Sequence, residues 1–449
     1  MGKKRSRTRQ GTLRPGRRVF RAVVAALLLF GATVAGGCKD AHEIESVGFV
    51  LGLGIDETVD RRIEVWVQVA LPSAKPQEAD KQESWTAKAV GKTVWEAVRE
   101  LNSRSAKVLM RAHVRTLVFG ERFARGGVSR ALDVLARDGQ FRYKSWVLVT
   151  PDPIGDVLSA KTEQSSLAAL FIDDIMRNTA RSSTAPRSRF LDLLTAIEQP
   201  GDQPLLARVY LAEPEEGGGQ PGDEPGNDEK TPREAPGLGV GRGEGEGGEE
   251  GGGGKAEQRE LRIEGSAAFR GDKMVGWLDG DDTAMALLIC NKLAGYSFVM
   301  PMPGSEGGTV GLDVIRSRTH TLFPEGVRSS PSALGATHVK LRITGTVDVR
   351  EVLSEQQLMS MRSLEELETG ISQYFEAGVR RLIDAAQNRL GCDVISIGEC
   401  VRRRIPARAW ERDMAPVWHD VFRQTSIVPD VHIEVGKRGM TMQSPEPTE

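Results

Sequence analysis

The sequence predicts an α+β (mixed α/β) protein of several domains. Its strands are expected to form mixed sheets, and its helices to pack against them. Its 449 residues correspond to about three domains at roughly 150 residues each. Segments of two-residue alternation, typical of strands, are interspersed with segments whose apolar residues recur every three or four positions, typical of helices. The chain is 39% hydrophobic and can therefore bury several cores, whereas many of its 50 glycines gather in one stretch that cannot.

The amino terminus, residues 1–37, has the parts of a bacterial signal peptide. Nine Lys and Arg residues and no Asp or Glu lie before an apolar run at residues 22–35, which is followed by Gly36 and Gly37. As a helix this run is about 21 Å long, which is short for a hydrocarbon core of about 30 Å. We therefore expect a cleaved signal rather than a permanent membrane span.

Cys38 is the predicted lipidation site. The sequence Ala35-Gly36-Gly37-Cys38 resembles the lipobox of bacterial lipoproteins, although Ala35 replaces the usual Leu. In such proteins the thiol accepts a diacylglyceryl group, and two acyl chains hold a protein firmly on a membrane. An ordinary cleaved secretory signal and an uncleaved anchor are the alternatives.

The charge of the mature chain argues against a nucleic-acid partner. Beyond residue 37 there are 51 Lys and Arg against 62 Asp and Glu, a net charge of −11. An acidic chain has no general attraction for a phosphate backbone.

Residues 213–258 predict a Gly/Glu-rich flexible linker. Residues 213–256 contain 16 Gly and 12 Asp or Glu but few bulky apolar side chains, so they cannot form a core. A specific acidic binding segment is the alternative. The linker would separate an N-terminal domain at residues 38–212, which could divide into two subdomains, from a C-terminal domain at residues 259–443.

Periodicity predicts the elements of the N-terminal domain in order. Residues 46–55 and 63–71 are rich in β-branched residues and flank a polar turn, which predicts a hairpin. The remaining strands are expected at residues 114–119, 145–149 and 206–211, and the helices at 93–101, 128–135, 166–179 and 188–198.

The C-terminal domain is predicted in the same way. A Gly-Asp turn at residues 271–272 predicts a hairpin of strands 260–269 and 273–278, and Asp281 is expected to cap a helix ending near residue 293. Ser363 and Glu366 resemble a capping box that opens a long helix, which ends at Gly391. Its apolar stripe is more typical of a core than of a cofactor groove. Further strands are expected at residues 308–321, 338–352 and 430–435, and a helix at 407–422.

The sequence displays no catalytic or metal-binding constellation. The six histidines are scattered without metal-ligand spacing, and no serine lies in a GxSxG turn, so we expect no enzyme activity, no metal and no cofactor. Asp279, Asp281 and Asp282 could suggest calcium, but helix capping explains them better.

Two cysteines leave an alternative open. Cys392 and Cys400 lie on either side of an expected short strand, and a disulfide between them is possible, although free buried thiols are favoured. The seven tryptophans have no spacing suited to stacking on a ligand and are expected in cores.

Several blocks of the sequence resemble the Ger(x)C family of spore-germination lipoproteins. The chain after the predicted cleavage site, CKDAHEI at residues 38–44, looks like the family's start, except that Lys39 replaces the usual Trp, and VLGLGIDET follows at residues 50–58. A second block of the family pattern is similar to residues 117–138, LVFGERFARGGVSRALDVLARD. The most specific match to the family lies at residues 264–283, EGSAAFRGDKMVGWLDGDDT. The ending, with residues 393–398, Trp410 and Trp418, also agrees, whereas the Gly/Glu-rich insertion is longer than the family pattern.

This resemblance implies a non-enzymatic C subunit of a nutrient germinant receptor. Such a subunit would be held by lipid on the outward face of the inner membrane of the spore, beside A and B membrane subunits. Cys38 is the one functional residue that carries over. The alternative is an extracytoplasmic solute-binding lipoprotein that captures the germinant itself, which would need a pocket with convergent polar groups between domains.

Overall fold

The structure is a computed structural model that describes part of the chain. It covers residues 20, 23–26, 46–71, 84–162, 164–178, 183–199, 201–213, 259–305, 307–323, 338–353 and 361–436. Contacts divide the chain into two units, residues 1–47 and 48–449, so the body from residue 48 onward is a compact unit of its own. Cys38, most of the predicted signal peptide and residues 214–258 lie outside the described residues.

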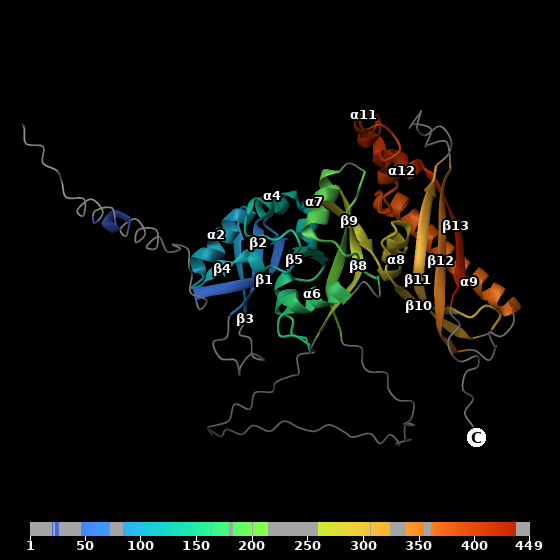
Figure 1. Cartoon of the computed structure of the whole chain (residues 1–449), viewed down its shortest axis with the longest axis horizontal. Coiled ribbons are helices and arrows are strands. Elements are labelled where there is room, and N and C mark those ends of the chain that lie inside the picture. Colours follow the sequence, from blue (N-terminus) through green and yellow to red (C-terminus); the bar gives the residue numbers. More distant parts are fainter. Residues whose placement is uncertain are drawn as a thin grey trace, which may run out of the picture. The chain divides into compact units, whose positions relative to one another are not determined.

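Within the described ranges, the first sheet has nine strands (Figure 1). The strands are β1 (Val47–Glu57), β2 (Ile63–Ala70), β3 (Ser84–Gly91), β4 (Val108–Met110), β5 (Thr116–Gly120), β6 (Trp146–Thr150), β7 (Leu205–Ala212), β8 (Glu260–Arg270) and β9 (Lys273–Leu278). Their order is β3-β2-β1-β5-β6-β7-β8-β9, and β4 pairs with β1. The two predicted hairpins, β1–β2 and β8–β9, are confirmed.

This sheet combines strands from both sides of residues 213–258. The centre, from β1 through β5 and β6 to β7, is parallel, whereas β7 and β8 pair antiparallel across that segment. The domain boundaries predicted from composition stay a prediction. The pairing nevertheless means that β8 and β9 complete a sheet that the preceding strands begin.

Helices cover both faces of the first sheet, because its central strands are apolar on both sides. In β5, Leu117 and Phe119 belong to one core and Val118 to another, and β6 alternates in the same way. The helices are α2 (Val94–Arg104), α3 (Glu121–Gly126), α4 (Ser129–Arg137), α5 (Ile154–Ser159), α6 (Ala168–Asn178) and α7 (Phe190–Glu198), with a short 3₁₀ turn at Arg111–His113. The mixed α/β class predicted from periodicity is therefore confirmed.

The second sheet has the order β10-β11-β12-β13, in which β12 and β13 are parallel. Its strands are β10 (Tyr296–Pro301), β11 (Thr309–Leu322), β12 (His338–Leu353) and β13 (Ser426–Val435). The long helix α9 (Met361–Asp384) packs along it and continues as a π-helical segment, Ala385–Leu390, to Gly391. The apolar stripe of α9, including Leu367, Ile371 and Phe375, is buried, so it is core as predicted.

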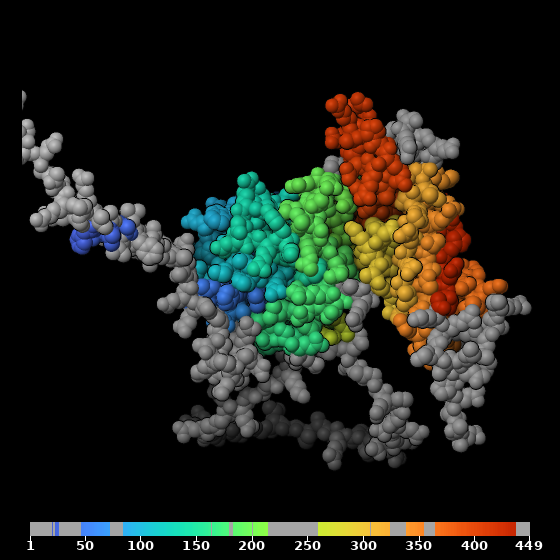
Figure 2. Space-filling model, in the orientation of Figure 1, coloured from blue at the N-terminus to red at the C-terminus, as the bar shows by residue number. Residues whose placement is uncertain are grey.

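Helix α8 (Gly280–Ile289) joins the two sheets. It contacts β8 and β9 of the first sheet and β11 of the second, and its yellow surface lies beside the orange surface of the second sheet in Figure 2. The predicted cap of this helix was wrong by two residues. Asp279, not Asp281, accepts a hydrogen bond from the Asp282 backbone N at 2.7 Å, whereas the Asp281 carboxylate accepts the Tyr296 hydroxyl at 2.6 Å.

Other local predictions also need correction. No strand lies between Cys392 and Cys400, because α10 (Ile397–Arg402) begins there. The helix predicted at residues 407–422 is broken into α11 (Ala407–Ala409), a π-helical turn (Trp410–Met414), a 3₁₀ turn (Ala415–Val417) and α12 (Trp418–Gln424). Pro416 lies in the 3₁₀ turn and cannot donate a helical hydrogen bond. Helix α9 begins at Met361, two residues before the predicted cap, and Trp95 is 53% exposed rather than in a core.

Candidate functional site

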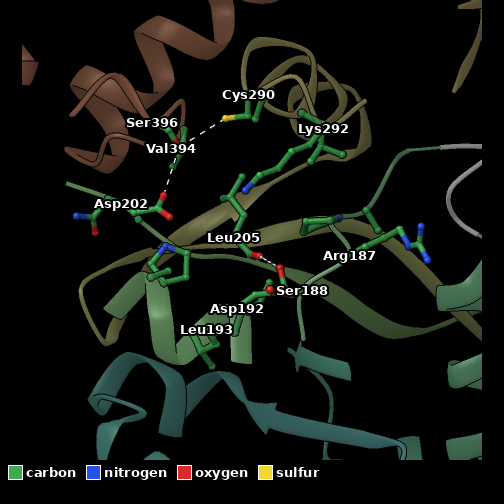
Figure 3. A pocket seen from close by; sticks show the side chains of 18 of the residues that line it. Arg187, Ser188, Asp192, Leu193, Asp202, Leu205, Cys290, Lys292, Val394 and Ser396 are labelled. Atoms are coloured by element: carbon green, nitrogen blue, oxygen red, sulfur yellow. Dashed lines mark hydrogen bonds between the residues drawn. The ribbon is translucent and has the colours of Figure 1, made fainter. Parts of the chain in front are cut away.

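A pocket of about 610 Å³ lies where α8 and the chain before α10 meet α7 and the residues around β7 (Figure 3). One wall consists of residues 183–196 with residues 202–206, and the other of residues 286–294 with Val394 and Ser396. The volume falls within the range of about 300–1,000 Å³ that is typical of small-molecule sites. The pocket therefore has the dimensions of a ligand site and is built from segments about 100 to 200 residues apart.

Unusual backbone conformations cluster at this pocket. Among the described residues, four non-glycine residues have positive φ, and three are here: Ser183 (46°), Asn291 (57°) and Ser396 (55°). Ser183 and Ser396 line the pocket, and Asn291 lies between its lining residues Cys290 and Lys292. Such conformations cost free energy for side chains with a Cβ and tend to persist where the surrounding structure holds them for function.

Each of these three residues is fixed by side-chain hydrogen bonds. The Ser183 hydroxyl accepts from the backbone N of Ala294 and Gly295, at 3.2 and 3.3 Å, and so joins the two walls. The Asn291 amide donates to the Thr319 backbone O and accepts from the Thr319 backbone N, at 2.9 and 2.8 Å. The pocket wall is thus pre-formed rather than loose.

A chain of polar groups crosses one end of the pocket (Figure 3). The Cys290 thiol donates to the Ser396 hydroxyl at 3.7 Å, and that hydroxyl donates to the Asp202 carboxylate at 3.4 Å. Burial raises the pKa of Cys290 to about 11. The thiol therefore stays protonated at neutral pH and does not supply the thiolate that nucleophilic catalysis needs.

Lys292 and Asp202 are charged groups of the pocket, and Asp202 accepts the Ser396 hydroxyl; a third charged residue, Arg187, lies over the Trp146 ring at 5.6 Å from its centroid. The hydroxyls of Ser188 and Thr195 donate to the backbone O of Leu205 and Leu191, and the Asp192 carboxylate caps α7. Among the described residues, neither Lys292 nor Asp202 has an ion-pair partner, and Figure 3 shows the Lys292 ammonium extending toward Leu205. A solute with groups of both charges could satisfy them.

Asp393 holds the segment that carries Val394 and Ser396. Its fully buried carboxylate accepts from the backbone N of Ile397 and Gly398, at 3.0 and 2.6 Å, and from Trp418 Nε1 at 3.1 Å. Burial raises its pKa to about 6, although these hydrogen bonds act in the opposite direction. The carboxylate caps α10, which explains why a helix stands where a strand was expected.

Comparison with known families identifies the chain. Residues 40–211 match the family model "Spore germination protein N-terminal domain", and residues 264–439 match "Spore germination B3/ GerAC like, C-terminal". The chain belongs to the GerAC family. The Ger(x)C resemblance seen in the sequence is confirmed, and the GerAC protein described here has a role in spore germination.

Three curated relatives of this GerAC protein come from Bacillus subtilis (strain 168). Spore germination protein B3 is 21% identical over 89% of this chain and 93% of its own length. Spore germination protein KC is 22% identical, over 93% of this chain and 94% of its own length. Putative spore germination protein YfkR is 23% identical, over 74% of this chain and 77% of its own length. The crystal structure of the GerBC protein matches with a TM-score of 0.45 and 17% identity, over 88% of this chain and 99% of that one.

The structure describes only some of the residues that the sequence analysis singled out in this GerAC protein. Cys38 lies outside the described residues. Cys392 and Cys400 are free thiols, as favoured, but only Cys392 is buried and Cys400 is partly exposed. The two thiols donate to the Phe269 backbone O at 2.8 Å and to the Thr321 hydroxyl at 3.8 Å. In the described part of the chain, no cluster of His, Cys, Asp and Glu is suited to a metal ion, and no helix is long and apolar enough to cross a bilayer.

Sequence reasoning missed the pocket entirely. Lys292 and Asp202 are separated by 90 positions, and no periodicity or motif connects them. The acid in the apolar run Cys392-Asp393-Val394-Ile395 was the one available signal, because a lone carboxylate among apolar residues must find buried donors.

Proposed function

We propose that this GerAC protein is a lipid-tethered subunit of a spore nutrient germinant receptor and acts through contacts with A and B membrane subunits rather than by catalysis. The observation that carries the proposal is the match of both germination domains, in order. The predicted signal peptide at residues 1–37, directly before Cys38, adds the expected lipid tether. A diacylated Cys38 would hold the body on the outward face of the inner spore membrane.

Two features of the described residues support a binding role. The thiol at the pocket is protonated at neutral pH, so it is no activated nucleophile. The polar side chains around it are engaged in capping helices and joining walls, not in positioning a base beside a nucleophile.

Replacing Cys38 with Ala tests the proposal. We expect the protein to leave the membrane fraction of spores and the rate of nutrient-triggered germination to fall at least tenfold, because two buried acyl chains supply most of the membrane affinity. Fractionation with immunodetection and the loss of optical density after nutrient addition measure the two effects. Cys400→Ala is the matched control and should leave both unchanged. A normal nutrient response from a soluble Cys38→Ala protein would refute the tether.

Capture of a small solute is a second candidate function, which the pocket specifically favours. The pre-formed wall and the charges of Lys292 and Asp202, which have no ion-pair partner among the described residues, are what a solute site between the two halves of the chain would need. Calorimetry of the protein in detergent micelles against amino acids and sugars should then show saturable binding.

Lys292→Met should weaken that binding about tenfold, because an anionic group of the solute would lose the exposed Lys292 ammonium as its partner. Lys161→Met is the control, since Lys161 is an exposed lysine away from the pocket. If no solute in the panel releases heat, or if both variants bind like the wild type, the pocket has no role in solute capture.

A further inference from the structure

The outer face of the second sheet is uncovered in the described part of the chain. Along β12, Val339, Leu341 and Ile343 are buried, whereas Lys340 and Arg342 between them are exposed. Strands alternate in this way when one face packs on a core and the other meets solvent. Helix α9 packs on the inner face, so the outward side chains are free to contact a partner.

Strand register gathers cations on this outer face. In the pairing of β11 with β12, Leu322 lies opposite Lys340 and His320 opposite Arg342. A bulge between Val314 and Arg316 turns both Ile315 and Arg316 outward, where they join Arg318. We call Arg316, Arg318, Lys340 and Arg342 the basic sheet face. With strands about 4.8 Å apart and a repeat of about 6.7 Å along each strand, these residues form a flat patch about 20 Å long.

The acids on this face do not neutralise it. Asp430 Oδ2 pairs with Lys340 at 2.8 Å and with Arg342 at 3.5 Å. The hydrogen bond and charge of Lys340, followed by His432, lower the pKa of Asp430. Glu434 lies outward on β13, opposite Thr346. Arg316 and Arg318 have no ion-pair partner among the described residues. The four cations therefore share this end of the face with the carboxylates of Asp430 and Glu434, and Asp348 lies on the same side of β12, two positions beyond the partner of Arg316.

Three histidines lie in the same surface region. His320 lies opposite Arg342, His432 contacts Asp430 at 2.9 Å, and His338 shares a hydrogen bond with Ser426 at 2.7 Å. By contrast, the cation at the other end of the sheet, Arg350, is paired with Asp313. The excess of positive charge is thus local to one end of the sheet, in a mature chain whose net charge is −11.

We propose that the basic sheet face binds the surface of a bilayer that contains anionic phospholipids. A flat array of cations suits a plane of lipid phosphates better than a single phosphate, which would need a concave site. Ile315 and Leu322, which are 51% and 39% exposed, flank the cations and would reach the headgroup layer. The inference rests on the proposed tether in one respect: a lipid on Cys38 would keep the body close to such a surface and raise the effective concentration of the face.

Vesicle binding of the chain from residue 39 onward tests this without the tether, because residues 48–449 are a compact unit of their own. We expect the protein to sediment with phosphatidylglycerol–phosphatidylcholine vesicles at low salt and not with phosphatidylcholine alone. R316Q/R318Q should lower the association constant about 30-fold, since each cation near an anionic surface contributes about fivefold. Raising the ionic strength to about 0.5 M should abolish the binding.

R99Q/R408Q is the matched control, because it removes the same charge from exposed helix positions on α2 and α11. It should change the association constant less than twofold. Equal binding to both vesicle types, absence of binding to phosphatidylglycerol, or equal losses in the two double variants would overturn the proposal. A different result would assign the basic sheet face to a protein partner instead of a bilayer. In that case the wild-type protein would not bind vesicles but would pull down a germinant receptor membrane subunit, and R316Q/R318Q would abolish the pull-down. Failure of the Cys38→Ala experiment would not alter these results, since no lipid is attached here.

Discussion

Replacing Trp146 with alanine is expected to lower the free energy of unfolding by about 4 kcal/mol, which is typical of a fully buried tryptophan. Trp146 lies on β6, in the parallel centre of the first sheet, and is 1% exposed. Its Nε1 donates to the buried Asp173 at 2.9 Å, and the Arg189 guanidinium stacks 3.6 Å from the ring centroid. The substitution removes packing, one hydrogen bond to a buried carboxylate, and a cation–π contact together.

Urea unfolding of the wild type and of two variants measures this effect. Trp146→Phe is the matched variant, because it keeps an aromatic ring in the core and removes the donor to Asp173. It should lose about 1–2 kcal/mol, since the Asp173 carboxylate also binds Arg115 at 3.0 Å and Arg177 at 2.8 Å. A loss below about 1 kcal/mol for Trp146→Ala would show that the sheet does not depend on this side chain.

The second large effect is a dependence of stability on pH that Asp393 introduces. Burial raises its pKa to about 6 from the ordinary 3.8, so the folded protein holds this proton over a range in which the unfolded chain has lost it. Folding is therefore favoured at low pH, and the contribution of this group to the free energy of unfolding falls as pH rises from about 4 to 6. The full change is about 3 kcal/mol, and it levels off above the folded pKa.

Comparison with Asp393→Asn isolates this contribution from all other titrating groups. Asparagine cannot ionise, and its amide oxygen can replace Oδ2 as the acceptor for Gly398 N and Trp418 Nε1, whereas its NH2 group loses the bond that Oδ1 accepts from Ile397 N. This loss lowers the stability of the variant at every pH and does not change the shape of the comparison. Urea unfolding at pH 4, 5, 6 and 7 should therefore show the wild type losing stability relative to the variant as pH rises. Parallel pH profiles for the two proteins would mean that the carboxylate is not desolvated as the structure indicates.

Local pattern predicted most of the elements of this protein. The hairpins β1–β2 and β8–β9, the strands β11 and β12 and the stripe of α9 followed from alternation, turn residues and helical spacing, which act over a few residues. The errors arose where a proline or a side-chain hydrogen bond, rather than hydrophobic periodicity, decided the outcome; Pro416, for example, interrupts the helix expected at residues 407–422. Asp393 turned an expected strand into the start of a helix because its carboxylate found two backbone N–H groups there.

The sequence by itself predicted the fold class, most of the elements and the membership of the family, because local periodicity and short sequence blocks carry these signals. It missed β3 and β10, and Cys38 as the lipid acceptor stays a prediction. The tertiary structure alone decided that β8 joins β7 across residues 213–258, that Lys292 and Asp202 share a pocket, and that Arg318 and Arg342 lie on one face. These facts depend on strand register and on packing between distant segments. Neither leaves a periodic signal in the sequence, because the same local pattern is compatible with many partners.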